Sequence, residues 1–153
     1  MLSKILVPVD GSDNSFRALA HAIFLSIKIQ EAQITVLNII EDPPTVYIYS
    51  PKIMEKLRAD YERQYTKILE RCKEMADKSG ININTVLIEG DPASKIIGYS
   101  EMEKFDIIII GSRGMGKFKE LIVGSVSNKV LHHAMFHNVT QIEFAKIKIN
   151  KIK

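Results

Sequence analysis

The residues best suited to chemistry follow a strongly apolar run, Asp106–Ile110. Gly111 and Gly114 lie three positions apart, and Gly124-Ser125 follows after nine further residues. Glycine lets backbone N–H groups approach an anion closely, and a serine that caps a helix directs the positive end of that helix toward the same anion. The spacing therefore predicts a phosphate site where a buried strand ends.

Two other phosphate-binding patterns fit this segment less well. The stretch from Gly111 to Lys117 approaches the P-loop pattern G-x-x-x-x-G-K-[ST], but Phe118 stands where the pattern needs a magnesium-binding hydroxyl. The dinucleotide fingerprint G-x-G-x-x-G also fails, because Lys119 stands where the third glycine belongs. An ordinary loop followed by a capped helix remains the alternative to a phosphate site.

The elements that must position this loop alternate between strand and helix. Short apolar runs rich in β-branched residues predict strands, and apolar residues at helical spacing predict helices. Asp91 is expected to cap the third helix, with Pro92 as its first residue. The predicted strands are Lys4–Val9, Gln33–Ile40, Asn82–Glu89 and Phe105–Ile110. The predicted helices run from Ser12 or Asp13 to about Ile29, from about Ile53 to Ser79, from Pro92 to about Lys104, and from a Ser125 cap to about Met135.

This alternation predicts an α/β fold with one open, doubly wound, mostly parallel sheet of five strands. The length of 153 residues fits a single domain, 1–153. A fifth strand with a bulge near Ala145 is predicted within Val139–Ile149, although a helix is the alternative. The strand order 3-2-1-4-5 is taken by analogy with other folds. In that order the first and fourth strands are neighbours, so Asp10 and Gly111, which follow them, lie at the same edge of the sheet.

Composition excludes several classes of function. The net charge is only +3, with lysine and glutamate interspersed, which argues against a dedicated nucleic-acid-binding protein. No apolar run approaches the length of a membrane span, and the first residues lack a signal-peptide layout, so no membrane partner is expected. A single cysteine, Cys72, excludes an intramolecular disulfide and fits a cytoplasmic protein.

The spacing Gly111-x2-Gly114-x9-Gly124-Ser125 resembles the nucleotide-binding signature of the universal stress protein family, G-x2-G-x9-G-[ST]. The similarity extends to the opening segment Lys4–Ser12, to the turn Gly90–Ala93 and to the last helix, Gly124–Ala134. It therefore covers about residues 3 to 134. The resemblance implies a Rossmann-like, adenine nucleotide alpha hydrolase-like domain with five parallel strands that binds ATP.

The resemblance also implies roles for individual residues. Asp10 would contact the ribose or the Mg²⁺ that accompanies the nucleotide, and Ile39 would hold the adenine through backbone and apolar contact. Gly111, Arg113 and Gly114 would line the phosphates. The full set of implied nucleotide-binding residues is Pro8, Val9, Asp10, Ile39, Ile110, Gly111, Ser112, Arg113, Gly114, Gly116, Gly124, Ser125, Val126 and Ser127.

Three classes of function stay open on the sequence. The first is a cytosolic stress or regulatory protein that binds ATP as a ligand with little or no hydrolysis. The second is a slow ATPase or nucleotidyl-transfer enzyme of related fold, which is disfavoured because Asp10 is the only acid placed near the phosphates. The third is a dimerisation module that uses no nucleotide. The resemblance implies a homodimer formed through the last strand, although the segment from Met135 onward departs from the family's pattern.

Overall fold

The computed structural model describes residues 3–29, 32–41, 50–112, 124–137 and 142–144. Strands and helices alternate along these residues, as predicted. The strands are β1 (Lys4–Val9), β2 (Gln33–Ile40), β3 (Ile83–Glu89), β4 (Ile107–Ile110) and β5 (Ile142–Phe144). The helices are α1 (Asp13–Lys28), α2 (Pro51–Asp77), α3 (Pro92–Met102) and α4 (Ser125–His137). None of the described helices is long and apolar enough to cross a membrane.

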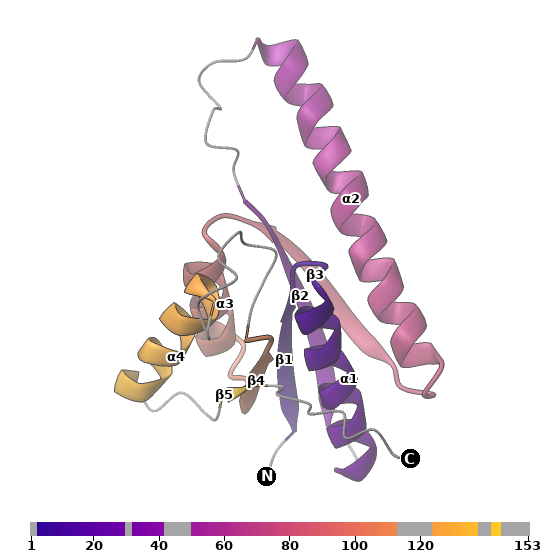
Figure 1. Ribbon diagram of the computed structural model, residues 1–153, viewed down its shortest axis with the longest axis vertical. Helices are drawn as coiled ribbons and strands as arrows, with labels where there is room; N and C mark the ends of the chain where they lie inside the picture. The colour runs from indigo at the N-terminus through magenta and orange to yellow at the C-terminus, as the bar shows by residue number, and fades with distance from the viewer. Residues whose placement is uncertain (1–2, 30–31, 42–49, 113–123, 138–141, 145–153) are drawn as a thin grey trace, which may run out of the picture.

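The five strands form one sheet in the order β3-β2-β1-β4-β5, and every pairing is parallel. Helices α1 and α2 cover one face of the sheet, and α3 and α4 cover the other (Figure 1). The predicted α/β fold with a doubly wound parallel sheet is therefore confirmed. The described part of the fifth strand is a three-residue segment rather than a helix. The expected bulge near Ala145 lies outside the described residues.

The core consists of two apolar layers, one on each side of the sheet. Along β1, Ile5, Val7 and Val9 pack against α1 and α2, whereas Leu6 packs toward α3 and α4. Because successive side chains of a strand point to opposite faces, a strand covered on both faces must be apolar throughout. This requirement explains the uninterrupted run of isoleucines in β4.

Several element boundaries differ from the prediction by one or two residues, including the starts of β3 and β4 at Ile83 and Ile107. Two of the helix boundaries have clear local reasons. Helix α2 begins at Pro51, two residues early, because the Ser50 hydroxyl caps it by accepting from the Ile53 N–H at 3.5 Å. Proline is well tolerated at the first helical position, where its missing N–H costs nothing. Helix α3 stops at Met102 because Lys104 adopts a left-handed conformation with φ of 55°. The Phe105 N–H then bonds the Ser100 carbonyl, which closes the helix end.

The amino ends of β1 and β4 are joined by the carboxylate of Asp106. Its Oδ2 accepts hydrogen bonds from the Ser3 N–H at 2.7 Å, the Ser3 hydroxyl at 2.9 Å and the Lys4 N–H at 2.8 Å. These hydrogen bonds, the backbone bond from Ser3 foremost, hold the pKa of the Asp106 carboxyl below its ordinary value. The folded state therefore favours the ionised form more strongly than the unfolded state does.

We expect Asp106→Asn to lower the melting temperature at pH 7, because the amide loses the charge-assisted bonds. Because the pKa of Asp106 is lower in the folded than in the unfolded state, the ionised carboxylate stabilises the fold fully at pH values above the unfolded-state pKa, near 4. This stabilisation is lost as the pH falls through the folded-state pKa. The difference in melting temperature between wild type and variant should therefore narrow below about pH 4. A difference of constant size from pH 7 to pH 3 would contradict this role.

Candidate functional site

The first part of the candidate site is the turn between β1 and α1. Asp10 follows β1, and its Oδ1 accepts a hydrogen bond from the Ser12 N–H at 2.9 Å. Gly11 has a φ of +85°, which favours glycine. Ser12 caps α1, since its hydroxyl accepts from the Ser15 N–H at 3.2 Å. The turn therefore exposes Asp10 at the carboxyl edge of the sheet, as the sequence predicted.

The second part is Gly111, which directly follows β4 and is buried. A Cβ atom built on Gly111 would lie 2.8 Å from the backbone carbon of Asn14 and 2.9 Å from its carbonyl oxygen. Asn14 belongs to the first turn of α1, so Gly111 permits the end of β4 to touch the start of that helix. Sequence reasoning had explained this glycine by the approach of a phosphate. The structure supplies another cause, which is packing against α1.

The third part is the start of α4. The buried Ser127 hydroxyl donates to the Gly111 carbonyl at 2.6 Å. The Gly124 N–H donates to the Ser112 carbonyl at 2.6 Å, which holds together the two ends of segment 113–123. The Gly124 carbonyl accepts from the Asn128 N–H at 2.9 Å. Ser125 is consequently the first residue of α4 rather than its cap, which corrects the prediction by one position.

The serines of α4 have different surroundings. Ser127 was predicted to close around phosphates, but it is 4% exposed and its hydroxyl is already bonded to Gly111. Ser125 is exposed, and Val126 is half-buried against the core layer under α3 and α4. Within this helix start, Ser125 is thus the side chain available to a ligand, whereas Ser127 joins the helix to the sheet.

Helices α1 and α4, which begin beside the ends of β1 and β4, differ in the charge of their first turns. Helix α1 carries Asp13 in its first turn, whereas the first turn of α4 has no acidic residue. A helix N-terminus carries a partial positive charge and backbone N–H groups that lack partners within the helix. Asp13 offsets that charge in α1. The start of α4 keeps its full attraction for an anion.

At the neighbouring strand end, β2 supplies both an apolar and a polar group. Ile39 is 9% exposed and packs into the layer under α3 and α4, as do Ile110 and, from β1, Leu6. Asn38 is fully buried, and its Nδ2 donates to the Val9 carbonyl at 2.7 Å. The Asn38 Oδ1 has no hydrogen-bond partner among the described residues. A buried amide oxygen without a partner is destabilising, so this end of the sheet retains an unused acceptor.

Helix α2 covers the same edge from the other layer. A Cβ atom on Gly11 would lie 2.9 Å from the Ile68 side chain, which shows how closely α2 approaches the β1–α1 turn. The Arg71 guanidinium lies 4.0 Å from the centre of the Phe16 ring and fixes α2 to α1. Burial raises the pKa of the Tyr65 phenol, the carboxylates of Glu41 and Asp10 raise it further, and a backbone hydrogen bond from Glu41 lowers it. Tyr65 and Glu41 thus lie near Asp10.

The structure brings together most of the predicted site. The residues that meet where β1, β4 and α4 converge are Asp10, Gly111, Ser112, Gly124, Ser125, Val126 and Ser127. The apolar members of the predicted site are buried in the strands: Pro8 and Val9 in β1, and Ile39 and Ile110 at the ends of β2 and β4. Arg113, Gly114 and Gly116 lie outside the described residues. Sequence reasoning missed Tyr65, Asn38 and Glu41. Glu41 could have been found, because it follows a parallel strand just as Asp10 does.

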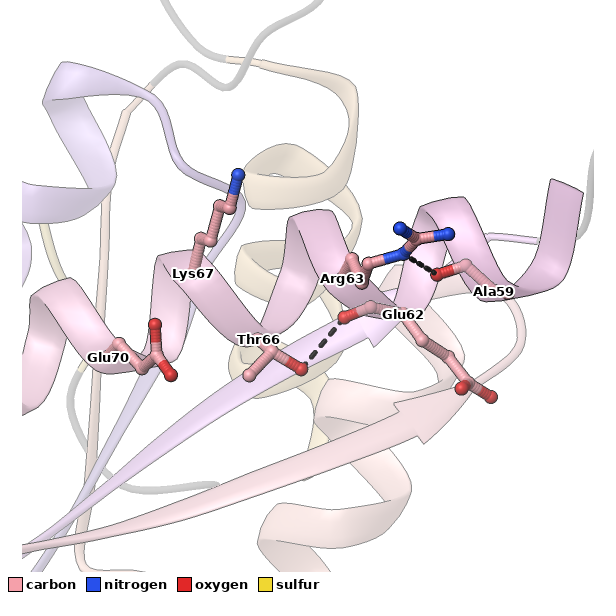
Figure 2. Close-up of a pocket in the computed structure, with 6 residues that line it drawn as sticks. All are labelled: Ala59, Glu62, Arg63, Thr66, Lys67 and Glu70. Carbon is pink, nitrogen blue, oxygen red and sulfur yellow. Dashed lines mark hydrogen bonds between the residues drawn. The ribbon is translucent and has the colours of Figure 1, made fainter. Parts of the chain in front are cut away.

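Two other features carry no chemistry. A shallow hollow runs along the outer side of α2 (Figure 2), but all of its lining residues come from that one helix: Ala59, Glu62, Arg63, Thr66, Lys67 and Glu70. The Arg63 Nε and the Thr66 hydroxyl both donate to carbonyls of the preceding turn.

Burial raises the pKa of the Cys72 thiol to about 11, so the thiol is protonated at neutral pH and acts as a packing group.

Comparison with known proteins decides the family. The model of the universal stress protein family matches residues 1–136. The chain belongs to the universal stress protein family. A curated member, universal stress protein YxiE of Bacillus subtilis, is 34% identical over 137 residues, which cover 85% of this chain and 92% of that protein.

Solved structures of universal stress proteins share the fold. Universal stress protein UspA from Lactobacillus plantarum superposes with a TM-score of 0.79 at 24% identity, over 94% of this chain and 97% of that one. A universal stress protein in complex with cAMP matches with a TM-score of 0.65 at 19% identity, covering 93% and 94% of the two chains. A family member from Arabidopsis thaliana with AMP bound matches with a TM-score of 0.64 at 18% identity, covering 93% and 90%.

The contact between Gly111 and Asn14 can be tested without any ligand. We expect Gly111→Ala to lower the free energy of unfolding by about 1–3 kcal/mol, because the new methyl group meets helix backbone that can move only with α1. Gly98→Ala is the matched control, since a Cβ there meets nothing within 4 Å and alanine favours the helix by up to about 1 kcal/mol. Urea denaturation measures the free energy of unfolding of both variants. Equal stability of the two variants would show that the close contact is unimportant.

Proposed function

We propose that this universal stress protein binds an adenine nucleotide, ATP with its Mg²⁺, at the carboxyl edge of the sheet between β1 and β4. One observation carries the proposal: Gly111 brings the end of β4 onto the first turn of α1, while Ser127 holds the acid-free start of α4 beside it. In doubly wound sheets, ligands bind outside the strand ends where the strand order reverses, and here that point lies between β1 and β4.

The parts of a nucleotide match the groups along this edge. The phosphates would lie at the start of α4, near the exposed Ser125 and the glycines Gly111 and Gly124. Asp10 would contact the ribose or share the Mg²⁺, and Ile39 at the end of β2 would lie by the adenine. No group of three potential metal ligands occurs among the described residues. Magnesium held mainly by phosphates and one carboxylate fits this arrangement, since Mg²⁺ commonly binds in that way.

Nucleotides bound by relatives support the same ligand class. One structural neighbour was determined with cAMP and another with AMP. Both contain adenine, a ribose and a phosphate, whereas they differ in the number and linkage of phosphates. They support an adenine nucleotide in general. The choice of ATP rests on the spacing of Gly111, Gly114 and Gly124-Ser125 in the sequence, because a glycine-rich loop before a helix start is a pattern that binds several phosphates.

Thermal unfolding with and without nucleotide tests the proposal. ATP with magnesium at about 100 times the dissociation constant should stabilise the protein by about 2.7 kcal/mol, which raises the melting temperature by roughly 5–10 °C. Ser125→Ala should keep the melting temperature of the free protein and reduce the shift, because it removes an exposed hydroxyl at the start of α4.

Ser79→Ala is the matched control, because Ser79 is also exposed but lies beyond the far end of α2. Its shift with ATP should equal that of the wild type. Absence of any shift in the wild type at saturating ATP and magnesium would refute nucleotide binding. A full shift in Ser125→Ala would refute the role of that hydroxyl alone.

We expect the nucleotide to be a ligand rather than a substrate. Steady-state release of phosphate should lie well below the median enzyme turnover of about 10 per second, since the described residues contain no group of three potential metal ligands that would activate a water. The measurement is phosphate release by the purified protein with ATP and magnesium. Rapid turnover that is lost in Asp10→Asn but kept in Asp77→Asn, at the far end of α2, would establish an ATPase instead.

Assembly and location complete the proposal. A homodimer through the C-terminal strand is consistent with the position of β5 at the sheet edge, where unpaired backbone groups can bond a second copy. A cytoplasmic location is consistent with the single, buried and reduced Cys72. The protein would then act as a cytoplasmic stress-response or regulatory protein whose state depends on bound nucleotide.

A further inference from the structure

Helix α2 contributes a side chain to the candidate site that lies outside the segments matching the family's nucleotide signature. Ile68 fixes the helix against Gly11 at the end of β1. Tyr65 lies three residues before Ile68 and therefore on the same side of α2, which is the side that faces the strand ends. The phenol is partly buried there and is bonded by the Glu41 backbone. The contact of Ile68 with Gly11 and the helical spacing therefore place Tyr65 on the side of α2 that faces the end of β1.

The charges around Tyr65 select which part of a nucleotide can approach it. The carboxylates of Glu41 and Asp10 both disfavour the phenolate, which shows that they make the local potential negative. A phosphate would be repelled from this position and attracted to the start of α4, where the first turn has no acid. The neutral nucleoside part of the ligand is the part that can lie against Tyr65.

Hydrogen-bond chemistry narrows the choice to the sugar. The Tyr65 oxygen accepts from the Glu41 backbone, so its own O–H can donate to another acceptor. Asp10 offers a carboxylate, which accepts from hydroxyl groups. A ribose hydroxyl accepts one hydrogen bond while it donates another, and carboxylates at the ends of strands bind ribose hydroxyls in other nucleotide-binding folds. Adenine also offers an acceptor, N7, beside its N6 amino donor, but the proposed function places the base by the apolar Ile39, which leaves the sugar for Asp10 and Tyr65.

A second observation points to a ligand on this side of the sheet. Asn38 is buried in the strand next to Val9, and the residues two and four before it pack toward α1 and α2. Because side chains alternate along a strand, Asn38 faces the same layer as Tyr65. Its Oδ1 has no partner among the described residues, although it is fully buried. A polar group or an ordered water delivered with a ligand would satisfy this acceptor.

We propose that the Tyr65 hydroxyl donates a hydrogen bond to a ribose hydroxyl of the bound nucleotide and that Asp10 accepts from the same sugar. This inference rests on the proposed function, because it assigns a contact within the proposed nucleotide site. It adds α2 to the elements that line that site, which are the ends of β1, β2 and β4 and the start of α4. It also makes the site selective for nucleotides with an intact ribose.

Calorimetric titration of the full chain, with magnesium present, tests the contact. The ligands are ATP and 2′,3′-dideoxy-ATP, and the proteins are wild type, Tyr65→Phe and Tyr99→Phe. Loss of one hydrogen bond should weaken ATP binding to Tyr65→Phe about 3- to 10-fold. Affinity for dideoxy-ATP should be the same in Tyr65→Phe and wild type, within about twofold, because that ligand lacks the sugar hydroxyls. Tyr99→Phe, in α3 beside Phe105 at the amino edge of the sheet, should bind both ligands like wild type.

Each possible result decides the proposal. Wild-type affinity of Tyr65→Phe for ATP would overturn the contact and leave the proposed function intact. An equal loss for ATP and dideoxy-ATP would also overturn it, because the effect would not pass through the ribose. No binding of either ligand by the wild type would refute the proposed function and this inference together. Melting temperatures of the free variants within about 2 °C of wild type would show that the fold is kept.

Discussion

The packing of Gly111 is the constraint on which the carboxyl edge of this protein depends. Its backbone touches the first turn of α1 at Asn14, and its carbonyl accepts the buried hydroxyl of Ser127 in α4. Any side chain at this position would force α1 and β4 apart. Because interiors are close-packed, such a displacement cannot be absorbed locally and would move the start of α4 as well. One missing Cβ atom therefore sets the geometry of two helix starts.

The two edges of the sheet have different roles. At the amino edge, Asp106 satisfies the first N–H groups of β1 with three hydrogen bonds to one carboxylate oxygen. At the carboxyl edge, the Asp10 carboxylate is exposed although it accepts from the Ser12 N–H, and the buried Asn38 Oδ1 has no partner among the described residues. Groups that are satisfied internally stabilise the fold, whereas groups that are left incomplete have capacity for a ligand.

Charge along the carboxyl edge is separated in a way that fits a nucleotide. Asp10 and Glu41 make the ends of β1 and β2 negative, and Tyr65 of α2 lies in that field. The start of α4 is positive, because its first turn carries no acid to offset the helix dipole. A nucleotide is neutral at its base and sugar and anionic at its phosphates. The orientation that we propose follows from this separation, with the nucleoside toward α2 and the phosphates toward α4.

The sequence by itself determined the fold class, the positions of most elements to within about two residues, and the family. Short continuous apolar runs rich in β-branched residues favour strands covered on both faces, so β1 and β2 were predicted to the residue, and Pro92 and Asp91 fixed the start of α3. The signature spacing located Gly111, Gly124 and Ser125. These features are local, because each depends on residues that are neighbours along the chain.

Only the tertiary structure decided which residues meet. Gly111 is needed for the contact with Asn14, and the Ser127 hydroxyl is bonded to the Gly111 carbonyl. The sequence pattern alone had predicted both residues to bind the ligand. Tyr65 comes under the electrostatic influence of Asp10 and Glu41 because α2 packs against Gly11, a contact between segments more than fifty residues apart. Such contacts depend on how the layers close over the sheet, and side-chain packing across layers leaves no periodic signal in the sequence.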